Sequence, residues 1–575
     1  MRNSRSLSLF FHNIFTIRIK KYQIILYQKQ NMQVSIWFSW PAWSWVNTSW
    51  LLLAEVLSNK GYTVYWDKEY ASVIKWGNNC FFIYISDEEE IFISKKIDYF
   101  LAYDEYAIEK NEKIYDLQNT FMFKNEKCTY KNTFAFWAAI RVFWIPLEEW
   151  KEALKKQFKK KKLSNEVMDI NFSDLENGYE YVMHCWWKAC KIINFDKIIG
   201  EKKHFMYWNE LIAKGGIASW LEFYAAYPMT PASSIIDEII KNNKVIFYQW
   251  EDEIAVSMAM LWAKFAWKRA MCWTSWWGFA LMTESIWFSN QAEIWGVYIL
   301  SQRDWPSTWT PTFTAQGDLN YALNASFWDT KPIVFAPSTF EETYTFTWKA
   351  LNRSDQYQHP IIMLVDKQLS ESYISINQKK LKSEIINRWV DIKWQKIDNY
   401  KRYEITESWI SPNAIPWGEN TTFIATSYEH DEYGFTNEEP TTKKAMMDKR
   451  AKKIETFIEK EFNKDFYWYE IINPKAKTFY ITMWINRYPI KNHINNKKDL
   501  WLIIIKSFQP FDKRLKEFLD KNEKNIEKII FIEINQSWIL EDLVRKECEL
   551  YNQRNNRIEH QRKYNLYPFF DEDII

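Results

Sequence analysis

Tryptophan occupies positions in this sequence where the chain has to turn. The run from Ser39 to Trp45 alternates Trp with Ser, Pro and Ala, and the runs from Thr274 to Gly278 and from Arg303 to Pro311 do the same. Turn formers of this kind are usually accompanied by glycine, which reaches positive φ without a Cβ clash, whereas an indole gains nothing there. These runs therefore have the pattern of glycine-rich loops with indoles in the place of glycine.

The counts of the two residues support this interpretation. The 575 residues include 34 Trp and 11 Gly, which together make 45, and about 40 glycines are expected at average usage. A gene in which UGA encodes glycine, translated with a table that reads UGA as Trp, produces this exchange. The alternative is a truly Trp-rich stacking or membrane-interface module, whose indoles would share one face at helical or strand spacing.

Charge and cysteine usage narrow the class of protein. The 75 basic and 73 acidic residues give a net charge of +2, which argues against nucleic acid as the main partner. The six cysteines form no C-x-x-C pair, so the chain has no iron–sulfur or structural zinc signature, and a reducing cytoplasm fits. No stretch is long and apolar enough to span a membrane.

Alternating apolar strands and helical patterns predict an α/β protein with three doubly wound parallel-sheet domains. We place them at 32–195, 206–385 and 406–575, with polar connections between them. The first opens as strand, turn-rich loop, helix and strand, which predicts parallel pairing. Residues 1–31 hold six Lys and Arg and no acid. They could pass for a targeting peptide, but we interpret them as translated upstream sequence, with Met32 as the start.

Four loops have the composition of binding loops. The turn from Trp37 to Trp50, read with glycine, suits an anion or a nucleotide, although a tight packing turn explains it equally well. Thr230 lies between two prolines at a predicted strand end, where ligands collect in parallel sheets. Three consecutive acids, at 251–253, begin a small-residue helix, and acids there are usually dipole partners. Arg303 leaves a strand into a Pro- and Thr-rich loop, where it suits a small carboxylate or a surface salt bridge.

With Trp read as glycine, these loops together resemble the 2-oxoacid:ferredoxin oxidoreductases. In the second segment the matching strings are Y-P-M-T-P from Tyr227, the E-D-E-I helix start, T-S-G-G-G from Thr274, Q-R-D-G-P-S-T-G from Gln302 and T-A-Q-G-D-L from Thr314. The first segment is similar to the family's gamma domain, with K-E-Y-A-S-x-I-K-G-G from Lys68. The third is similar to its C-terminal domain, with Y-K-R-Y-E-I-T, G-I-S-P and E-H-D-E-x-G at 400–434. This order is that of a gamma–alpha fusion of the 2-oxoglutarate type.

The resemblance implies an alpha subunit that shares thiamine diphosphate with a beta subunit. Mg²⁺ and a 4Fe-4S cluster are expected in that partner, because this chain has no G-D-G motif with an Asn-rich stretch; Gly317-Asp318 is followed by Leu319. Coenzyme A would take the acyl group and ferredoxin the electrons. A heterodimer or a dimer of heterodimers is expected, in the cytoplasm, with no nucleic acid and no membrane.

The resemblance also assigns roles to individual residues. Glu253 matches the catalytic glutamate that hydrogen-bonds the N1′ atom of the cofactor's pyrimidine ring. Thr230 and Arg303 match the substrate-binding Thr and Arg, with Arg303 on the 2-oxoacid carboxylate. Tyr227, Pro228 and Ser275 are expected to contact the cofactor. No residue of this chain is expected to bind a metal, and we interpret His430 of E-H-D-E as part of a turn.

Several functions stay open at this stage. The substrate is expected to be 2-oxoglutarate, with pyruvate and branched-chain or aryl 2-oxoacids as alternatives. A non-catalytic scaffold that docks the beta subunit and a transketolase-like enzyme without electron transfer are the rivals from other classes. The glycine interpretation makes a structural prediction too: many indoles should lie in tight turns or at positive φ, some crowding the cofactor cleft, whereas packed core faces would contradict it. Trp150 and Trp394 fall outside every motif and are candidates for genuine tryptophan.

Overall fold

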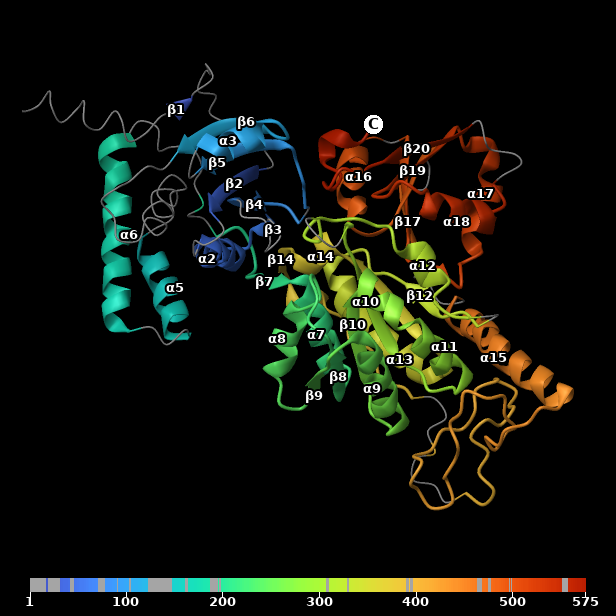
Figure 1. Cartoon of the computed structure of the whole chain (residues 1–575). Helices are drawn as coiled ribbons and strands as arrows, with labels where there is room; N and C mark the ends of the chain where they lie inside the picture. Colours follow the sequence, from blue (N-terminus) through green and yellow to red (C-terminus); the bar gives the residue numbers. More distant parts are fainter. Residues whose placement is uncertain are drawn as a thin grey trace, which may run out of the picture.

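The structure is a computed structural model built around three β-sheets (Figure 1). It describes residues 17–18, 32–41, 46–70, 78–89, 91–102, 105–122, 147–160, 164–186, 195, 198–306, 310–327, 330–388, 392, 397–462, 468–473, 477–495, 497, 499–550 and 557–575. The sheets confirm the α/β class, and most of their buried strands are apolar runs separated by helices.

The first sheet has eight strands in the order β1-β6-β5-β2-β4-β3-β14-β7. Their bounds are β1 Ile17–Arg18, β2 Gln33–Pro41, β3 Thr63–Glu69, β4 Asn78–Ser86, β5 Lys96–Ala102, β6 Asp116–Met122, β7 His204–Tyr207 and β14 Tyr373–Ile376. Helices α2 (Val46–Asn59), α3 (Glu105–Glu112), α5 (Leu147–Lys160) and α6 (Asn165–Trp186) accompany it. In this sheet only the neighbouring pairs β2–β5 and β5–β6 are parallel. The parallel pairing expected for the first two strands is wrong, because β4 lies between β2 and β3 and is antiparallel to both.

The second sheet has seven strands in the order β18-β12-β13-β11-β10-β8-β9, all parallel except β18. The bounds are β8 Phe223–Ala226, β9 Ile246–Gln249, β10 Ala270–Ser275, β11 Val297–Gln302, β12 Ile333–Phe335, β13 Ile361–Asp366 and β18 Ser507–Gln509. Its helices are α7 Trp208–Ala218, α8 Ser234–Ile240, α9 Glu253–Phe265, α10 Trp276–Leu281, α11 Thr283–Gln291, α12 Leu319–Leu323, α13 Phe340–Tyr357 and α14 Lys367–Glu371. Strands β10, β11 and β13 are buried along their whole length, as expected for a parallel sheet covered on both faces.

The third sheet has the order β15-β17-β16-β19-β20, with β15 antiparallel and the rest parallel. Its strands are β15 Tyr469–Ile472, β16 Thr478–Thr482, β17 Leu500–Ile505, β19 Lys528–Glu533 and β20 Ile558–Arg562. Helices α16 (Arg487–Ile494), α17 (Arg514–Lys521) and α18 (Ile539–Glu547) pack around it, and α15 (Pro440–Glu461) precedes it. Its central strands β16, β17 and β19 are buried, mostly apolar runs.

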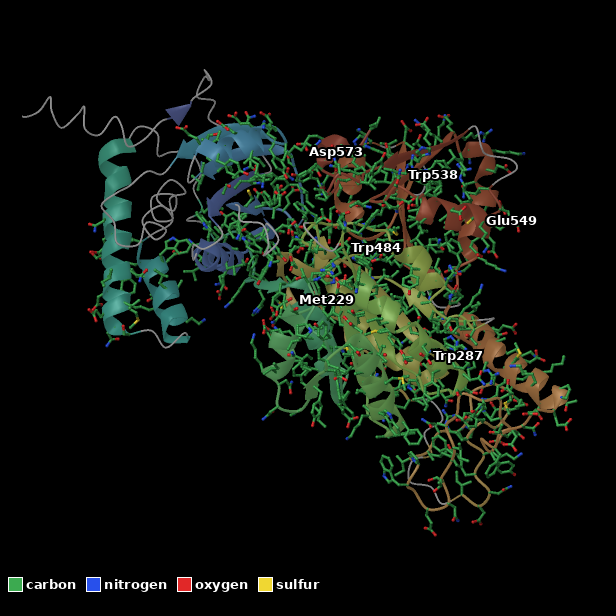
Figure 2. All side chains as sticks on the ribbon, in the orientation of Figure 1. Met229, Trp287, Trp484, Trp538, Glu549 and Asp573 are labelled. Carbon is green, nitrogen blue, oxygen red and sulfur yellow. The ribbon has the colours of Figure 1, made fainter. Side chains whose placement is uncertain are left out.

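Strands cross between the three units. Strand β14 lies within the segment of the second sheet, yet together with β7 it completes the first sheet. Strand β18 of the third segment pairs with β12 of the second sheet. Figure 2 shows Trp484 at this junction, where its indole N–H donates to the Leu364 carbonyl oxygen at 3.3 Å. The units are therefore joined by shared strands as well as by side-chain packing.

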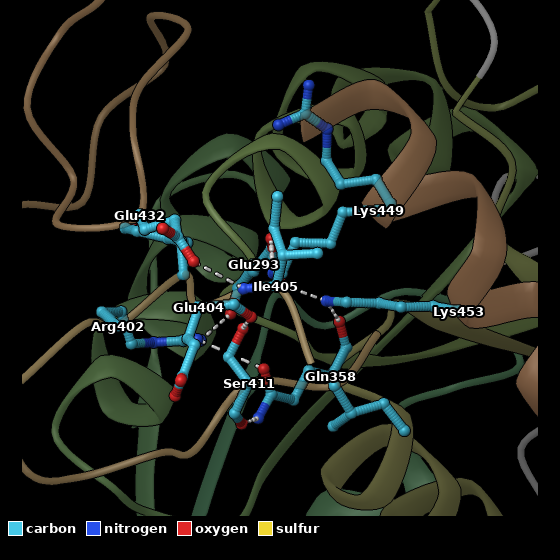
Figure 3. Close-up of polar contacts among 12 residues, drawn as sticks. Glu293, Gln358, Arg402, Glu404, Ile405, Ser411, Glu432, Lys449 and Lys453 are labelled. Carbon is cyan, nitrogen blue, oxygen red and sulfur yellow. Dashed lines mark hydrogen bonds and ion pairs between the residues drawn. The ribbon is translucent and has the colours of Figure 1, made fainter. Parts of the chain in front are cut away.

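A buried ionic cluster fastens α15 to the second sheet's unit (Figure 3). The Glu293 carboxylate accepts hydrogen bonds from Lys449, with Nζ–Oε2 at 2.7 Å, and from Lys453. Arg402 Nη2 donates to the Glu293 carbonyl oxygen at 2.6 Å. The Glu293 and Lys449 side chains are fully buried, so the carboxylate needs these cations to offset its desolvation.

The tryptophans divide into two groups. Among the described residues, five of the twelve non-glycine positions with positive φ are tryptophans: Trp220, Trp267, Trp409, Trp484 and Trp538. Others lie in the core, as Trp66 does in β3, Trp208 at the start of α7 and Trp273 in β10. Trp150 is buried on α5, and Trp394 lies outside the described residues. The positive-φ tryptophans match the structural expectation for glycine positions. The tryptophans buried in strands and helices do not, because that expectation places the indoles in turns.

Candidate functional site

The predicted site residues gather at one edge of the second sheet. Strands β8, β10 and β11 are neighbours and run parallel, with Ala226 opposite Trp273 and Ser275 opposite Ser301. Their carboxyl ends therefore lie at the same edge, and the loops that carry Thr230, Ser275 and Arg303 leave the sheet there. Strand β9 pairs with β8 and also ends at this edge, just before Glu253. Ligands bind at this edge in open parallel sheets.

The structure distinguishes the three acids that begin α9. Asp252 is the N-cap, and its Oδ1 accepts a hydrogen bond from Ala255 N at 2.8 Å. Glu251 is exposed to solvent. Glu253 is only 3% exposed, and among the described residues its Oε1 has no hydrogen-bond partner. Burial raises the pKa of the Glu253 carboxyl, and the nearby Asp252 adds to the rise. A buried carboxyl oxygen without a hydrogen-bond partner costs free energy unless a ligand binds to it. Glu253 is therefore the acid of the three that is placed to bind a ligand.

Gly278 and Thr274 form the wall beside this carboxyl. A Cβ atom added to Gly278 would collide with the Glu253 carboxyl and the Thr274 hydroxyl. Ser275, the N-cap of α10, is buried, and its hydroxyl oxygen has no hydrogen-bond partner among the described residues. The start of α10 is therefore a tight cradle that leaves two polar groups, on Glu253 and Ser275, free for a ligand.

The Y-P-M-T-P loop forms the neighbouring wall. Tyr227 and Pro228 are exposed at the edge, and Thr230 is half-buried. Asn209 holds the loop by donating from Nδ2 to the Pro231 carbonyl oxygen at 3.0 Å. Met229, labelled in Figure 2, accepts a long contact of 3.9 Å at Sδ from the Thr274 hydroxyl. The loop is thus tied both to α7 and to the cradle.

Arg303 is a largely buried cation. It is 9% exposed, its Nε has no hydrogen-bond partner, and no carboxylate lies within ion-pair distance among the described residues. Burial lowers the pKa of its guanidinium. A desolvated guanidinium of this kind attracts an anion from solution, and its fork geometry suits a carboxylate.

The first sheet closes over the Arg303 loop, a contact that the sequence alone did not reveal. Tyr70, just after β3, receives at its carbonyl oxygen a hydrogen bond of 2.7 Å from the Thr312 hydroxyl. The Tyr70 hydroxyl donates to Glu371 Oε1 of α14 at 2.8 Å. Residues 71–77, which complete K-E-Y-A-S-x-I-K-G-G, lie outside the described residues, as do 307–309 and residues 42–45 of the turn from Trp37 to Trp50.

Indoles stand at this edge as well. Trp276 and Trp277 begin α10 directly after Ser275, with ring centroids 5.2 Å apart. The Trp276 indole N–H is buried and has no partner among the described residues. Trp305 follows Arg303 by two residues and is exposed. These rings occupy the loops that surround Glu253 and Arg303.

His430 is held as a turn residue. Its Nδ1 lies 3.0 Å from the Tyr428 carbonyl oxygen, and burial lowers the pKa of its ring. Within the part of the chain that the structure describes, no three His, Cys, Asp or Glu side chains are grouped to hold a metal. In the same described part, none of the helices has the length and apolar character needed to cross a membrane.

Comparison with known proteins identifies relatives of this chain. Residues 214–449 match the family model described as pyruvate flavodoxin/ferredoxin oxidoreductase, thiamine diP-binding. The 2-oxoacid:ferredoxin oxidoreductase 2 subunit alpha of Aeropyrum pernix is 30% identical over 350 residues, 57% of this chain, and the match spans about half of that relative, 53% of its length. The 2-oxoglutarate synthase subunit KorA of Methanocaldococcus jannaschii is 30% identical over 304 residues, 52% of this chain and 79% of the relative.

A solved structure extends the likeness over nearly the whole chain. It is the 2-oxoglutarate:ferredoxin oxidoreductase from Magnetococcus marinus with 2-oxoglutarate, coenzyme A and succinyl-CoA bound. Its TM-score is 0.81 at 26% identity, and the match covers 95% of this chain and 98% of that one. The chain therefore belongs to the family of 2-oxoacid:ferredoxin oxidoreductase alpha subunits.

Proposed function

We propose that this chain is the alpha subunit of an enzyme that oxidatively decarboxylates a 2-oxoacid, with 2-oxoglutarate as the preferred substrate. The 2-oxoacid and coenzyme A give acyl-CoA and CO₂, and the two electrons released reduce two ferredoxins. The observation that carries the proposal is that the buried Glu253 carboxyl and the buried Arg303 guanidinium lie at the same sheet edge, Arg303 forming no ion pair among the described residues.

The residues at this edge fit thiamine diphosphate. Among the described residues, neither Glu253 Oε1 nor the Ser275 hydroxyl has a hydrogen-bond partner, and the cradle at Gly278 leaves no room for a side chain. Glu253 would share a proton with the pyrimidine N1′ atom, and the raised pKa of its carboxyl suits that role. Tyr227, Pro228 and Ser275 would contact the ring. When bound, the cofactor supplies the carbanion chemistry and holds the electrons.

Arg303 and Thr230 would bind the substrate. The guanidinium would pair with the 2-oxoacid carboxylate, which orients the bond that breaks. The Thr230 hydroxyl, on the loop that follows β8, would hydrogen-bond close to the reacting carbonyl. Pyruvate and branched-chain or aryl 2-oxoacids carry the same carboxylate and ketone, so they remain the alternative substrates.

The remaining parts of the machinery are assigned to a partner. A beta subunit would supply the diphosphate and Mg²⁺ site and the 4Fe-4S cluster, in a cytoplasmic heterodimer or dimer of heterodimers. Residues 32–195 would form the gamma-like domain, 206–385 the pyrimidine-binding domain and 406–575 the C-terminal domain. A scaffold without activity has no use for a buried carboxyl and a buried guanidinium that lack partners, because each costs stability.

We infer further that glycine occupies most of the tryptophan positions. The ring centroids of Trp37 and Phe82 lie 3.7 Å apart and those of Phe38 and Trp50 lie 3.2 Å apart, closer than the range of about 4.5–7 Å that aromatic pairs prefer. The buried indole N–H groups of Trp66, Trp208 and Trp273 have no partner among the described residues, although buried Trp usually finds one. Glycine at these positions removes both problems, and it suits the positive-φ positions too.

The test of the function uses the alpha chain co-expressed and co-purified with its proposed beta subunit. The Glu253→Gln variant should lose at least about 100-fold in CoA-dependent ferredoxin reduction, while the complex still assembles. Glu251→Gln, at the exposed neighbouring acid, should keep wild-type activity. Substantial activity of Glu253→Gln would remove the assignment. Mass spectrometry of tryptic peptides covering 37–50 and 273–277 decides between glycine and tryptophan at the recoded positions.

A further inference from the structure

Gln316 is a fully buried residue in the second half of the loop that Arg303 begins, and the proposed function gives it no role. Its side chain makes three hydrogen bonds. The Nε2 atom donates to Asp366 Oδ2 at 3.2 Å. The Oε1 atom accepts from Asn486 Nδ2 at 2.9 Å and from the Ile534 backbone N–H at 3.2 Å. Both ends of this amide therefore have partners inside the protein, each on a different strand end or loop.

The partners of Gln316 in the third sheet's unit lie at the carboxyl ends of two strands, β16 and β19, which are neighbours and run parallel. Asn486 follows β16 closely, and Ile534 follows β19 directly. The Gln316 backbone binds at the same place, because its N–H donates to the Ile534 carbonyl oxygen at 2.8 Å and its carbonyl oxygen accepts from Asn535 Nδ2 at 3.2 Å. Open parallel sheets bind ligands at this edge, and here the edge holds the loop of another unit.

Hydrogen bonds on both sides of Arg303 tie it to the second half of its loop. On one side, the Asp318 N–H donates to Gln302 Oε1 at 2.9 Å. On the other side, the Asp304 N–H donates to the Phe313 carbonyl oxygen at 3.1 Å. The buried glutamine lies between these two attachment points in the chain. A displacement of that half of the loop therefore moves the backbone on either side of the guanidinium.

The bond to Asp366 reaches Arg303 by a second route. Strands β11 and β13 are paired in parallel, and Gln302 stands opposite Asp366 at their carboxyl ends. The other oxygen of this carboxylate, Oδ1, accepts from the Leu369 N–H at 2.8 Å and caps α14. Gln316 is therefore attached to the strand end beside the one that carries Arg303, as well as to the third sheet.

We propose that Gln316 is a positioning residue for substrate binding: by joining the third sheet's unit to the loop of Arg303, it holds the guanidinium where the 2-oxoacid carboxylate binds. This inference rests on the proposed role of Arg303 as the carboxylate-binding residue. Without the side-chain bonds of Gln316, this part of the loop is held only by bonds to its backbone, and the guanidinium is less well fixed. The bound substrate and the transition state lose the same interaction, so KM rises while kcat stays nearly unchanged.

The experiment is steady-state oxidation of 2-oxoglutarate by the assembled alpha–beta complex, with coenzyme A and ferredoxin at saturation. Gln316→Ala removes three hydrogen bonds and should raise the KM for 2-oxoglutarate at least about tenfold. Its kcat and its KM for coenzyme A should stay within about twofold of wild type. Gln291→Ala is the matched control, because Gln291 is also buried but donates to the Tyr428 carbonyl oxygen at 3.2 Å, outside the loop. The control should keep the wild-type KM.

An exchange of hydrogen-bonding groups tests the contact between Gln316 and Asp366 itself. Gln316→Glu places two carboxyl groups face to face, and Asp366→Asn places two amide donors face to face, since the remaining oxygens are engaged by Asn486, Ile534 and Leu369. Each single variant should raise the KM at least about fivefold. The double variant again pairs one donor with one acceptor, and its KM should return to within about threefold of wild type. A residue that only stabilises the fold would not produce this pattern in KM.

Arg303→Met separates this inference from the proposed function, and it should raise the KM for 2-oxoglutarate about 100-fold. A wild-type KM in Arg303→Met would remove the substrate site itself. A raised KM in Arg303→Met together with a wild-type KM in Gln316→Ala would overturn only the role of Gln316, and so would a double variant with a KM as high as those of the single variants. If Gln316→Ala does not assemble, Asn486→Ala removes one of the three bonds and should raise the KM about threefold; a wild-type KM there would overturn the same role.

Discussion

The Glu253 carboxyl and Gly278 are packed so closely that no residue larger than glycine fits at 278. Helix α9 contributes the acid and α10 the glycine, so the acid's position depends on how tightly the two helix starts approach. A carboxyl held in this way cannot turn away from the sheet edge. The contact therefore fixes the direction of the Glu253 carboxyl, which a catalytic acid requires.

Gly278→Ala tests this relationship. The added Cβ must displace the Glu253 carboxyl or the Thr274 hydroxyl, and overpacking of this kind costs about 1–3 kcal/mol. We expect a loss of activity larger than the loss of thermal stability explains, measured on the assembled complex. Gly317→Ala is the matched control, because a Cβ there meets nothing within 4 Å. Equal activity of the two variants would show that the contact is not needed.

Much of the second and third sheets could be predicted from the sequence, because buried parallel strands appear as continuous apolar runs such as 361–366 and 500–505. The strand exchanges could not be predicted, since the partner of a short strand such as β14 is set by long-range packing. The choice of Glu253 among three acids came from the family resemblance; in the structure it follows from the cap formed by Asp252.

Glu293→Gln tests the buried cluster that fastens α15. The change leaves Lys449 and Lys453 buried without their carboxylate, and breaking a buried ion pair from one side costs about 3–5 kcal/mol. Chemical denaturation should show this loss as a lower midpoint. Lys444→Met, which removes an exposed lysine from the same helix, should leave the midpoint unchanged. A loss for Glu293→Gln no larger than that of the control would mean that the cluster does not stabilise the junction.

Glu470→Gln tests the pH dependence of a second, partly exposed cluster. Burial alone would raise the pKa of Glu470, but Arg487 and Lys506 lower it to about 2, against an ordinary value of 4.5. The folded state therefore gains stability above pH 4.5, and this gain disappears as the pH falls from 4.5 toward 2. The variant should be about 1–2 kcal/mol less stable at pH 7, a figure reduced for solvent screening, and nearly equal to wild type only as the pH falls to about 2. Urea unfolding at the two pH values measures the difference, and the exposed pair Lys477–Glu527 offers Glu527→Gln as a control without such a difference. A gap between wild type and Glu470→Gln that stays constant with pH would contradict the role of this carboxylate.

Trp220→Gly tests the interpretation that tryptophans at positive φ occupy positions that favour glycine. Trp220 has φ of 62° and is 69% exposed, so glycine relieves a left-handed conformation worth about 1–2 kcal/mol and removes little packing. Trp262 is almost equally exposed, at 67%, but it lies inside α9, where Trp262→Gly should cost about 0.5–1 kcal/mol in helix propensity. Proteins made with Trp at both positions should therefore respond with opposite signs in thermal unfolding. A destabilising Trp220→Gly would mean that the indole contributes packing at this turn that outweighs the strain of its backbone.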